Sequence, residues 1–387
     1  MRGFAVTLLI WLSSLTASSQ PLSLSGYLKD MQGFYYLENP VNVGGSSLDW
    51  STYNLIHHRL NLDWQPIEAL HVEVGMRNRL MSGPLISTVP GYAASFESDA
   101  GTMDLSWNLV TKPRFFLNTT LDRLFVEYTW RQFQLKVGRQ RINWGINLVW
   151  NPNDLFNAFS FTDFDYEERP GSDAILFTWY PSGSSSLDVV AQTDSSHSLT
   201  LATRYVFNWH DWDIQVLSGK MADDAVIGGG CTGAIDRVSL RAEGSVFIPL
   251  KQGFSTSVSA TLSADYTLEN ALFLHAAYLY TSLGGSGSGG LSVLNPSNQL
   301  SAKRLSLGKH ELFAQASYPF NPLLNASGAC LFNPVDGSVY LSPSLSISLH
   351  DNLELLLTAQ CLLGEPGSEY GYLGNTWAGF GRLKWSY

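Results

Sequence analysis

The residues of this 387-residue chain best suited to chemistry are its histidines, serines and carboxylates, which together can form a hydrolytic triad. His57 and His58 are adjacent, so on a β-strand they point to opposite faces. His71 and His275 fall on polar positions, and serine is so abundant that a chance Ser/His/acid set is easily drawn. The sequence contains no GxSxG, HExxH or phosphate-binding glycine loop. We therefore expect no catalytic residues and no enzyme.

The sequence also gives little support for a metal or a nucleic-acid site. Cys231, Cys330 and Cys361 are far apart and show no CxxC spacing, which argues against a zinc site and a disulfide framework. Asp163-Phe164-Asp165 lacks the glycine and the ligand spacing of a calcium loop. The formal net charge is −10, whereas phosphate binding needs a basic surface. We expect no metal, no cofactor and no nucleic-acid partner.

Basic side chains are concentrated between residues 59 and 141, on positions that we assign to the polar faces of strands. If several of them line one wall of a pore, they form a ladder of charge that selects the ions that enter. The alternative is that the charges pair with one another, as Arg123 or Arg131 would with Glu127, and only satisfy a crowded interior. The candidate pore-lining residues are Arg59, Arg77, Arg79, Arg123, Glu127, Arg131, Lys136, Arg139 and Arg141.

The elements that must position these side chains are β-strands, because apolar and polar residues alternate strictly along the chain. The alternation is clearest at 237–246, 255–266 and 338–349. A period of two places the two sets on opposite faces of a strand. Similar segments elsewhere bring the total to about 18, with an error of about two, and most have the length that a tilted strand needs to cross a bilayer.

Soluble β-sandwiches and propellers alternate as well, but several features favour a membrane barrel. Charged residues make up only 14% of the chain. The apolar faces often end in Trp or Tyr, as an interfacial girdle would. The polar faces are rich in Ser, Thr and Gly rather than Lys and Glu. No run of 18 apolar residues follows residue 20, so a spanning chain must close into a barrel.

Residues 1–19 have the pattern of a secretory signal peptide. Arg2 supplies the positive charge, residues 4–15 are apolar, and Ala17-Ser18-Ser19 offers a small-residue cleavage site. An uncleaved anchor is the alternative, but the apolar run is shorter than the roughly 20 residues of a spanning helix. Residues 20–387 are then expected to form a single transmembrane β-barrel domain.

The connections between predicted strands divide into tight turns and long loops. The long ones are at 81–118, 144–172 and 283–306, as on the extracellular side of such barrels. The loop at 144–172 is rich in aromatic residues, so we expect it to fold into the lumen as a constriction; a structural cap on the rim is the alternative. Its candidate residues are Trp144, Trp150, Asp163, Asp165, Glu167, Glu168 and Arg169.

The last residues resemble the C-terminal strand of bacterial outer-membrane proteins. Leu383, Trp385 and Tyr387 share one face, and the chain stops on an aromatic ring. The resemblance implies recognition by the barrel-assembly machinery, with these three residues as the assembly signal. The usual last residue in that family is Phe, so Tyr387 departs from the pattern.

A second resemblance covers about 45 residues. The segment 137–145 reads VGRQRINWG, the segment 150–156 reads WNPNDLF, and the segment 167–173 reads EERPGSD. This order is similar to a recurring segment of porin-like outer-membrane barrels related to the alginate-export type. The resemblance implies a porin-like, substrate-conducting barrel of a Bacteroidota-like organism, and it carries no substrate with it.

Together these patterns predict an all-β fold, a transmembrane antiparallel β-barrel of about 16–18 strands with long extracellular loops, in a bacterial outer membrane. The expected function is passive diffusion of small solutes, with anions favoured if the basic ladder lines the lumen. One alternative is a non-conducting barrel for assembly or export, and another is an outer-membrane lipid-modifying hydrolase. The expected partners are outer-membrane lipid, the barrel-assembly machinery and small solutes; the oligomeric state is open.

Overall fold

The computed structural model describes residues 22–43, 46–158, 161–163, 165, 167, 169, 171–285 and 301–387. The predicted signal peptide, residues 1–19, lies outside this part of the chain. The described residues contain two short helices, α2 (Pro84–Thr88) and α3 (Tyr92–Glu97). Neither is long and apolar enough to cross a membrane.

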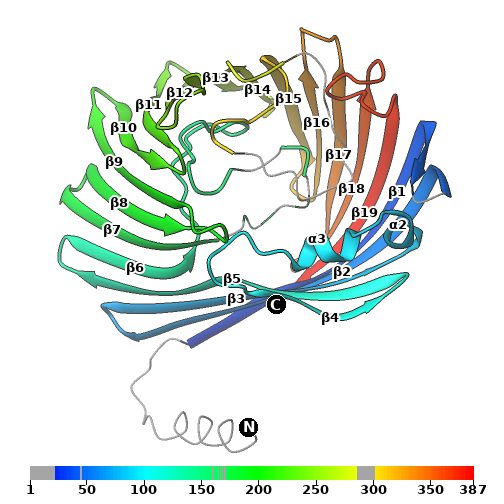
Figure 1. The fold of residues 1–387 in the computed structure, drawn as a ribbon, viewed down its shortest axis with the longest axis horizontal. Helices are drawn as coiled ribbons and strands as arrows, with labels where there is room; N and C mark the ends of the chain where they lie inside the picture. The colour runs from blue at the N-terminus through cyan, green and yellow to red at the C-terminus, as the bar shows by residue number, and fades with distance from the viewer. Residues whose placement is uncertain are drawn as a thin grey trace, which may run out of the picture.

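Nineteen strands of the described chain form one antiparallel sheet, and all of them except β4 (Ser106–Lys112) build a closed ring (Figure 1). Each ring strand pairs with the next, and β19 closes the ring against β1. The predicted antiparallel barrel of 16–18 strands is confirmed, with 18 strands in the ring. The ring strands are β1 (Leu22–Val43), β2 (Ser46–Ile67), β3 (Leu70–Ser82), β5 (Phe115–Trp130), β6 (Phe133–Gln140), β7 (Ser172–Ser182), β8 (Ser185–Thr193), β9 (Leu199–Trp209), β10 (Trp212–Met221), β11 (Asp224–Ile235), β12 (Val238–Pro249), β13 (Ser257–Thr267), β14 (Phe273–Thr281), β15 (His310–Asn321), β16 (Leu324–Phe332), β17 (Val339–His350), β18 (Leu353–Leu363) and β19 (Thr376–Ser386).

The two faces of the ring differ as the alternation predicts. On β1, Tyr27 and Lys29 are buried inside, whereas Leu28 is exposed on the outside. The outer face elsewhere is just as apolar, because Ile227 and Leu262 are 60% and 56% exposed. Such a surface is unfavourable in water and suits the hydrocarbon layer of a bilayer.

The connections at the two rims differ in length. Those beside the chain ends are short turns, for example 210–211 and 351–352. His210 and Asp211 both have positive φ, as a tight hairpin turn of this kind requires. The opposite rim carries the long connections 83–105, 141–171 and 282–309, and residues 286–300 of the last one lie outside the described chain.

The predicted loop 81–118 is wrong in part, because it contains β4 and the two helices. β5 is long enough to have two partners along one edge: β4 pairs with residues 115–120 and β6 pairs with residues 124–130. β4 therefore extends the sheet beyond the C-terminal end of β6. The alternation did not identify this strand because it is short and because its exposed residues include both apolar and polar side chains.

The seam between β1 and β19 closes the ring. Tyr387 exchanges two backbone hydrogen bonds with Gly26, both at 3.0 Å. The Tyr387 ring lies where a side chain at Gly26 would lie, and its hydroxyl is 2.9 Å from Nε2 of His58. The last residue is thus bonded to two neighbouring strands through its backbone and its side chain.

Gly138 is a position where the fold requires glycine. Its φ is +122°, and a Cβ there would overlap the carbonyl oxygen of Leu124. We predict that Gly138→Ala lowers the free energy of unfolding on the order of 1–3 kcal/mol, because the backbone is strained for any L side chain. Denaturant titration of the folded barrel, followed by Trp fluorescence, measures the change.

The matched control is Gly328→Ala. Gly328 lies in β16 with ordinary backbone geometry, and a methyl group added there would meet no atom within 4 Å. This variant should unfold at the same denaturant concentration as the natural protein. Equal midpoints for the Gly138 and Gly328 variants would contradict the prediction.

Candidate functional site

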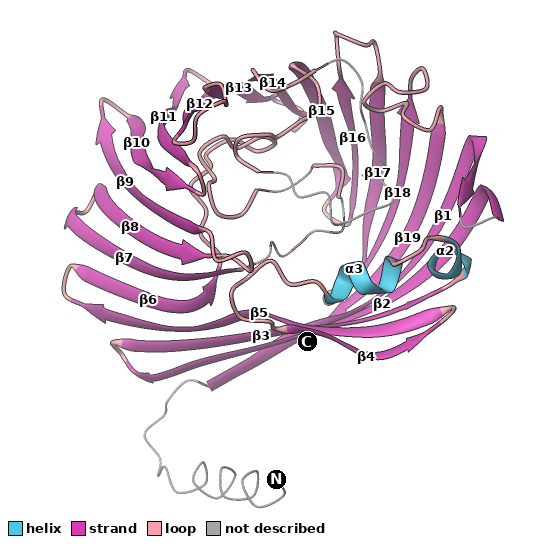
Figure 2. Ribbon diagram, in the orientation of Figure 1, coloured by secondary structure: helices cyan, strands magenta, loops and turns pink. Residues whose placement is uncertain are grey.

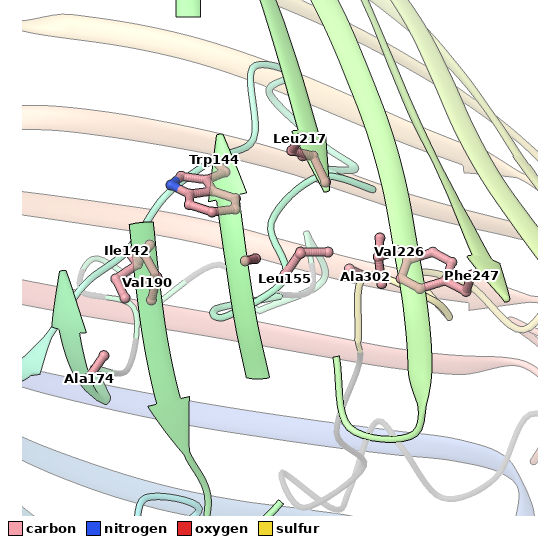
Figure 3. Packing of buried hydrophobic residues seen from close by; sticks show 10 residues of the cluster. Ile142, Trp144, Leu155, Ala174, Val190, Leu217, Val226, Phe247 and Ala302 are labelled. Carbon is pink, nitrogen blue, oxygen red and sulfur yellow. The ribbon is translucent and has the colours of Figure 1, made fainter. Parts of the chain in front are cut away.

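The lumen contains the described part of the long connection 141–171, here called the inner loop (Figure 2). It leaves β6 after Gln140 and returns to the wall at Ser172, the start of β7. Its first part packs on inward side chains of the wall. Ile142, Trp144 and Leu155 form one buried apolar cluster with residues of β7 to β12 (Figure 3). The cluster fixes this part of the loop against the wall.

Hydrogen bonds hold the same part of the inner loop. Gln215 of β10 donates to the carbonyl of Trp144 at 2.9 Å. Asn153 donates to the carbonyl of Gly229 on β11 at 3.0 Å, and accepts from Ser245 of β12 at 2.8 Å. A Cβ at the adjacent Gly228 would come within 2.9 Å of the Asn153 side chain. The glycines of β11 therefore make room for the loop.

Two buried carboxyl groups lie in this region. Asp154 has no exposed surface, and its carboxylate is 3.8 Å from Arg169. Burial raises the pKa of Asp154 to about 6, although the charge of Arg169 opposes this. Glu243 of β12 accepts a hydrogen bond from the backbone N–H of Ile146 at 3.2 Å. Glu243 thus binds the loop to the wall, whereas Asp154 and Arg169 connect two parts of the loop itself.

The far part of the inner loop is held by ion pairs to the seam of the barrel. Asp165 lies 2.8 Å from Lys29 of β1 and 3.1 Å from Arg382 of β19. Glu167 lies 2.8 Å from Arg382 and 2.7 Å from Lys384. These three cations all lie on the inner face, so the loop crosses the lumen from β12 to β1.

The charges around Glu167 decide its protonation. Partial burial raises its pKa, but Lys29, Lys384 and Arg382 outweigh this and hold the pKa of Glu167 below its ordinary value. Glu167 is therefore ionised at neutral pH, and its pairs with β19 are formed there.

A basic cluster lies on the inner face of β2, β3 and β5. Its centre is Asp122, which has no partner in β3 because the register shifts there, with Arg123 opposite Gly75 and Leu121 opposite Met76. This β-bulge turns Asp122 and Arg123 toward the same side. One oxygen of Asp122 lies 2.6 Å from Arg59, 3.4 Å from Arg77 and 3.8 Å from Arg123.

Arg79 completes the cluster. Its guanidinium donates to Asn118 at 2.8 Å and lies 4.8 Å from the ring centre of Phe96 in α3. Arg123 also donates to the carbonyl of Arg169 at 2.8 Å, which connects the cluster to the inner loop. Arg59, Arg77 and Arg123 thus share one oxygen of Asp122, and Arg79 lies beside Arg77 on the same face of β3. Three positive charges on one carboxylate leave an excess of positive charge in these ion pairs.

Several predicted pore-lining residues do not lie in this cluster. Arg131 is exposed in the turn between β5 and β6, with its guanidinium 5.4 Å from the Trp130 ring, so its placement on the wall was wrong. Arg141 is exposed at the start of the inner loop. Glu127 and Lys136 form an ion pair at 2.7 Å. For these two residues the structure therefore shows charge pairing, the alternative to a pore-lining role.

Arg139 was placed on the wrong face as well. Arg139 alternates in step with Leu135 and Val137, which are exposed on the outer face of β6. Its own side chain is buried at the C-terminal end of this strand. It contacts Asp173 at 2.7 Å and Asp99 at 2.6 Å. Arg139 thereby clamps the segment before β4 onto the ends of β6 and β7.

The candidate constriction residues that the structure describes lie at different places along the inner loop. Trp144 and Trp150 are buried against the wall, where Trp150 meets the Phe313 ring edge-on at 6.2 Å. Asp163 is exposed and lies within electrostatic reach of Lys29 and Arg77. Glu168 lies outside the described residues.

Other charged residues of the site were missed by the sequence analysis. Lys29, Arg382 and Lys384 lie on the polar parity of strands that the alternation identified, so this signal was present. Asp122 gave no signal, because the bulge that turns it inward changes the alternation at that residue. The pairing of acidic with basic side chains across the lumen was not predictable either. It joins residues more than 130 positions apart in the sequence, for example Lys29 and Asp165.

A hydrogen-bonded group on the rim joins three connections above β14 to β19. Glu369 accepts from the backbone N–H groups of Leu307 and Gly308, both at 3.0 Å, and from the Asn333 amide at 2.9 Å. Tyr370 donates to Glu311 at 3.0 Å. These bonds hold the described parts of these connections at the edge of the ring.

The histidines considered for hydrolysis do not assemble a triad in the described chain. His71 lies 2.9 Å from Asp63, and His275 lies 3.5 Å from Asp265. Neither ring is hydrogen-bonded to a serine among the described residues. Each imidazole lies beside a carboxylate in the polar interior.

No family model matches the sequence, and no curated protein matches it. Solved structures match over nearly the whole chain. OccK5 (OpdH) of Pseudomonas aeruginosa has a TM-score of 0.57 at 10% identity, covering 94% of this chain and 97% of that one. OccAB4 of Acinetobacter baumannii has a TM-score of 0.59 at 9% identity, covering 95% and 99%. OprD of Pseudomonas aeruginosa has a TM-score of 0.57 at 9% identity, covering 95% of each. These similarities establish a shared barrel fold.

Asp122 is the carboxylate on which the basic cluster depends. We predict that Asp122→Ala lowers the free energy of unfolding by about 3–5 kcal/mol, because Arg59, Arg77 and Arg123 are left without their shared partner. The control is Asp223→Ala, which removes an exposed pair with Lys251 and should cost less than about 1 kcal/mol. Denaturant titrations that give equal losses for the two variants would refute this role of Asp122.

The ion pairs of Glu167 predict a pH dependence. A carboxyl group whose pKa is lowered by folding stabilises the fold above its unfolded pKa, about 4.5, and loses this effect as the pH falls below it. We predict that the stability difference between the natural protein and Glu167→Gln is full at pH 7 and decreases below about pH 4.5. Unfolding titrations from pH 3 to 8 measure it; a difference independent of pH would contradict the ion-pair account.

Proposed function

We propose that the protein is a channel of the bacterial outer membrane through which small solutes diffuse passively. The observation that carries the proposal is the closed ring of 18 strands around a charged interior that contains the inner loop. Rings of 16–18 strands are wide enough to leave an aqueous channel. The solved structures that share this fold are outer-membrane porins of the Occ and OprD group, which supports the proposal.

The solutes that the channel favours are anions. Arg59, Arg77 and Arg123 share Asp122 on one wall, with Arg79 beside them, and Arg123 contacts the inner loop at the carbonyl of Arg169. A wall with an excess of positive charge lowers the electrostatic barrier for anions and raises it for cations. The inner loop narrows the lumen beside this wall, so a permeating ion passes within reach of the cluster.

A non-conducting barrel is the second candidate, and one observation favours it. The inner loop is fixed at β10 to β13, at β15, and at the seam, so it occupies a large part of the interior. Such a barrel would act in assembly or export. The two candidates differ in whether the inner loop leaves a continuous water path.

Two finer assignments rest on the sequence. The segments 137–145 and 167–173 support kinship with alginate-export-type porins and a Bacteroidota-like source. Leu383, Trp385 and Tyr387 lie at the C-terminal end of the last strand, and their side chains are exposed on the outer face. The barrel-assembly machinery would bind them there.

Ion selectivity tests the role of the basic cluster. We predict that Arg77→Gln combined with Arg79→Gln shifts the reversal potential in a salt gradient toward cation preference, because two positive charges leave the wall. The control is Arg131→Gln, which removes one positive charge from an exposed turn. Planar-bilayer recordings measure all three proteins.

The control should retain the reversal potential of the natural protein. A shift of equal size for the control and the double variant would show that total charge, and not the wall, sets the selectivity. An unchanged reversal potential for the double variant would remove the basic cluster from the permeation path.

A further inference from the structure

The outer face of the barrel carries polar side chains at an unexpected place. Asp30 and Gln32 of β1, Asn54 and His58 of β2, and Asn78 of β3 all point outward. We call these five residues the outer polar patch. Their direction follows from the alternation, because the residues between them, such as Lys29 and His57, are buried inside.

The outer polar patch lies at the middle of the wall. On β2, Trp50 and Trp64 face outward near the two rims, as in the aromatic girdles that flank the lipid-facing band. Asn54 and His58 lie between these two tryptophans. Asp30 pairs with Ile56, the residue midway between Asn54 and His58. The patch is therefore at the depth where hydrocarbon is the surrounding solvent.

The patch contrasts with the opposite wall. Between the ends of the strands, the outward residues of β13 to β15 are Val, Ala, Leu and Tyr, for example Leu262, Leu274 and Leu312, whereas His310 and Phe320 lie at the two ends of β15. A bilayer solvates those side chains well, but it cannot solvate a carboxylate or an amide. Asp30 and Gln32 are nonetheless exposed.

Hydrogen bonds divide the patch into two groups. Asn78 bonds His58 at 3.2 Å and accepts from Thr119 at 2.8 Å, while His58 also meets Tyr387. The other, more exposed half is the group of Asp30, Gln32 and Asn54, in which both amides donate to the same oxygen of Asp30. This half offers a carboxylate and two amides to whatever covers it.

We propose that the outer polar patch is a contact surface between two copies of this chain in the membrane. The more exposed half is self-complementary, because the carboxylate of one copy can accept hydrogen bonds from the amides of the other. In a two-fold contact the same surface is used by both copies. Polar side chains that are costly in lipid are satisfied in such a contact.

The neighbouring surface of β19 permits a close approach. Gly379 and Gly381 face outward there, between Trp377 and Leu383. A Cβ at Gly379 would meet no atom within 4 Å, so no neighbouring side chain covers the outer face of the strand at this point. Small residues beside polar ones are the composition of close contacts between proteins in membranes. A contact of this kind depends on the membrane-spanning fold and not on conduction.

The test counts the copies in lipid. The full mature protein, labelled with one dye per chain, is reconstituted in supported bilayers at several densities and counted by single-molecule photobleaching. The natural protein should show two or more bleaching steps per particle. Asp30→Leu, Gln32→Leu and Asn54→Leu together should raise the dissociation constant on the order of tenfold or more, because the central contacts are lost.

The triple variant should remain folded, since leucine is favourable on a lipid-facing wall; its heat-dependent migration in gels checks this. The matched control places three leucines on the opposite wall, as Val258→Leu, Ala260→Leu and Ala264→Leu, and should keep the natural number of copies. A natural protein with one copy at every density, or a triple variant that still associates, would overturn the proposal.

Discussion

Closure of the ring is the constraint on which the rest of the structure depends. No water reaches the hydrocarbon layer, so every backbone N–H and C=O there must be bonded within the protein. β1 and β19 meet this demand along eleven paired residues, from Tyr27 with Ser386 to Leu37 with Thr376. Once the ring is closed, each strand has one face in lipid and one in the lumen, and all inward charges share one interior.

That shared interior explains why the inner loop is fixed so firmly. Lys29, Arg382 and Lys384 point inward from the seam and would be costly there without partners. Asp165 and Glu167 supply these partners from the inner loop. Charge pairing, one of the two alternatives for the lumen charges, is seen for some residues, and the permeation role is proposed for others. Glu127 and Lys136 are paired with each other, whereas Arg59, Arg77 and Arg123 share Asp122.

The sequence predicted the parts of the structure that obey a period of two. Segment 255–266 became β13, and most strand ends lie within a few residues of their predicted positions. Local departures were not predictable in this way. The bulge at Asp122, the inverted face of Arg139 and the turn position of Arg131 each depend on a register that neighbouring strands impose. The outer polar patch was missed because polar residues had been assigned to the lumen as a rule.

The most direct test of the proposed channel is the single-channel conductance of the refolded protein, residues 20–387, in a planar bilayer. If the inner loop is tied to the wall and leaves a water path beside the basic cluster, single insertions should give stable, stepwise currents of uniform size. A correctly folded barrel that inserts and never conducts would contradict this, and would leave the closed barrel for assembly or export as the better explanation.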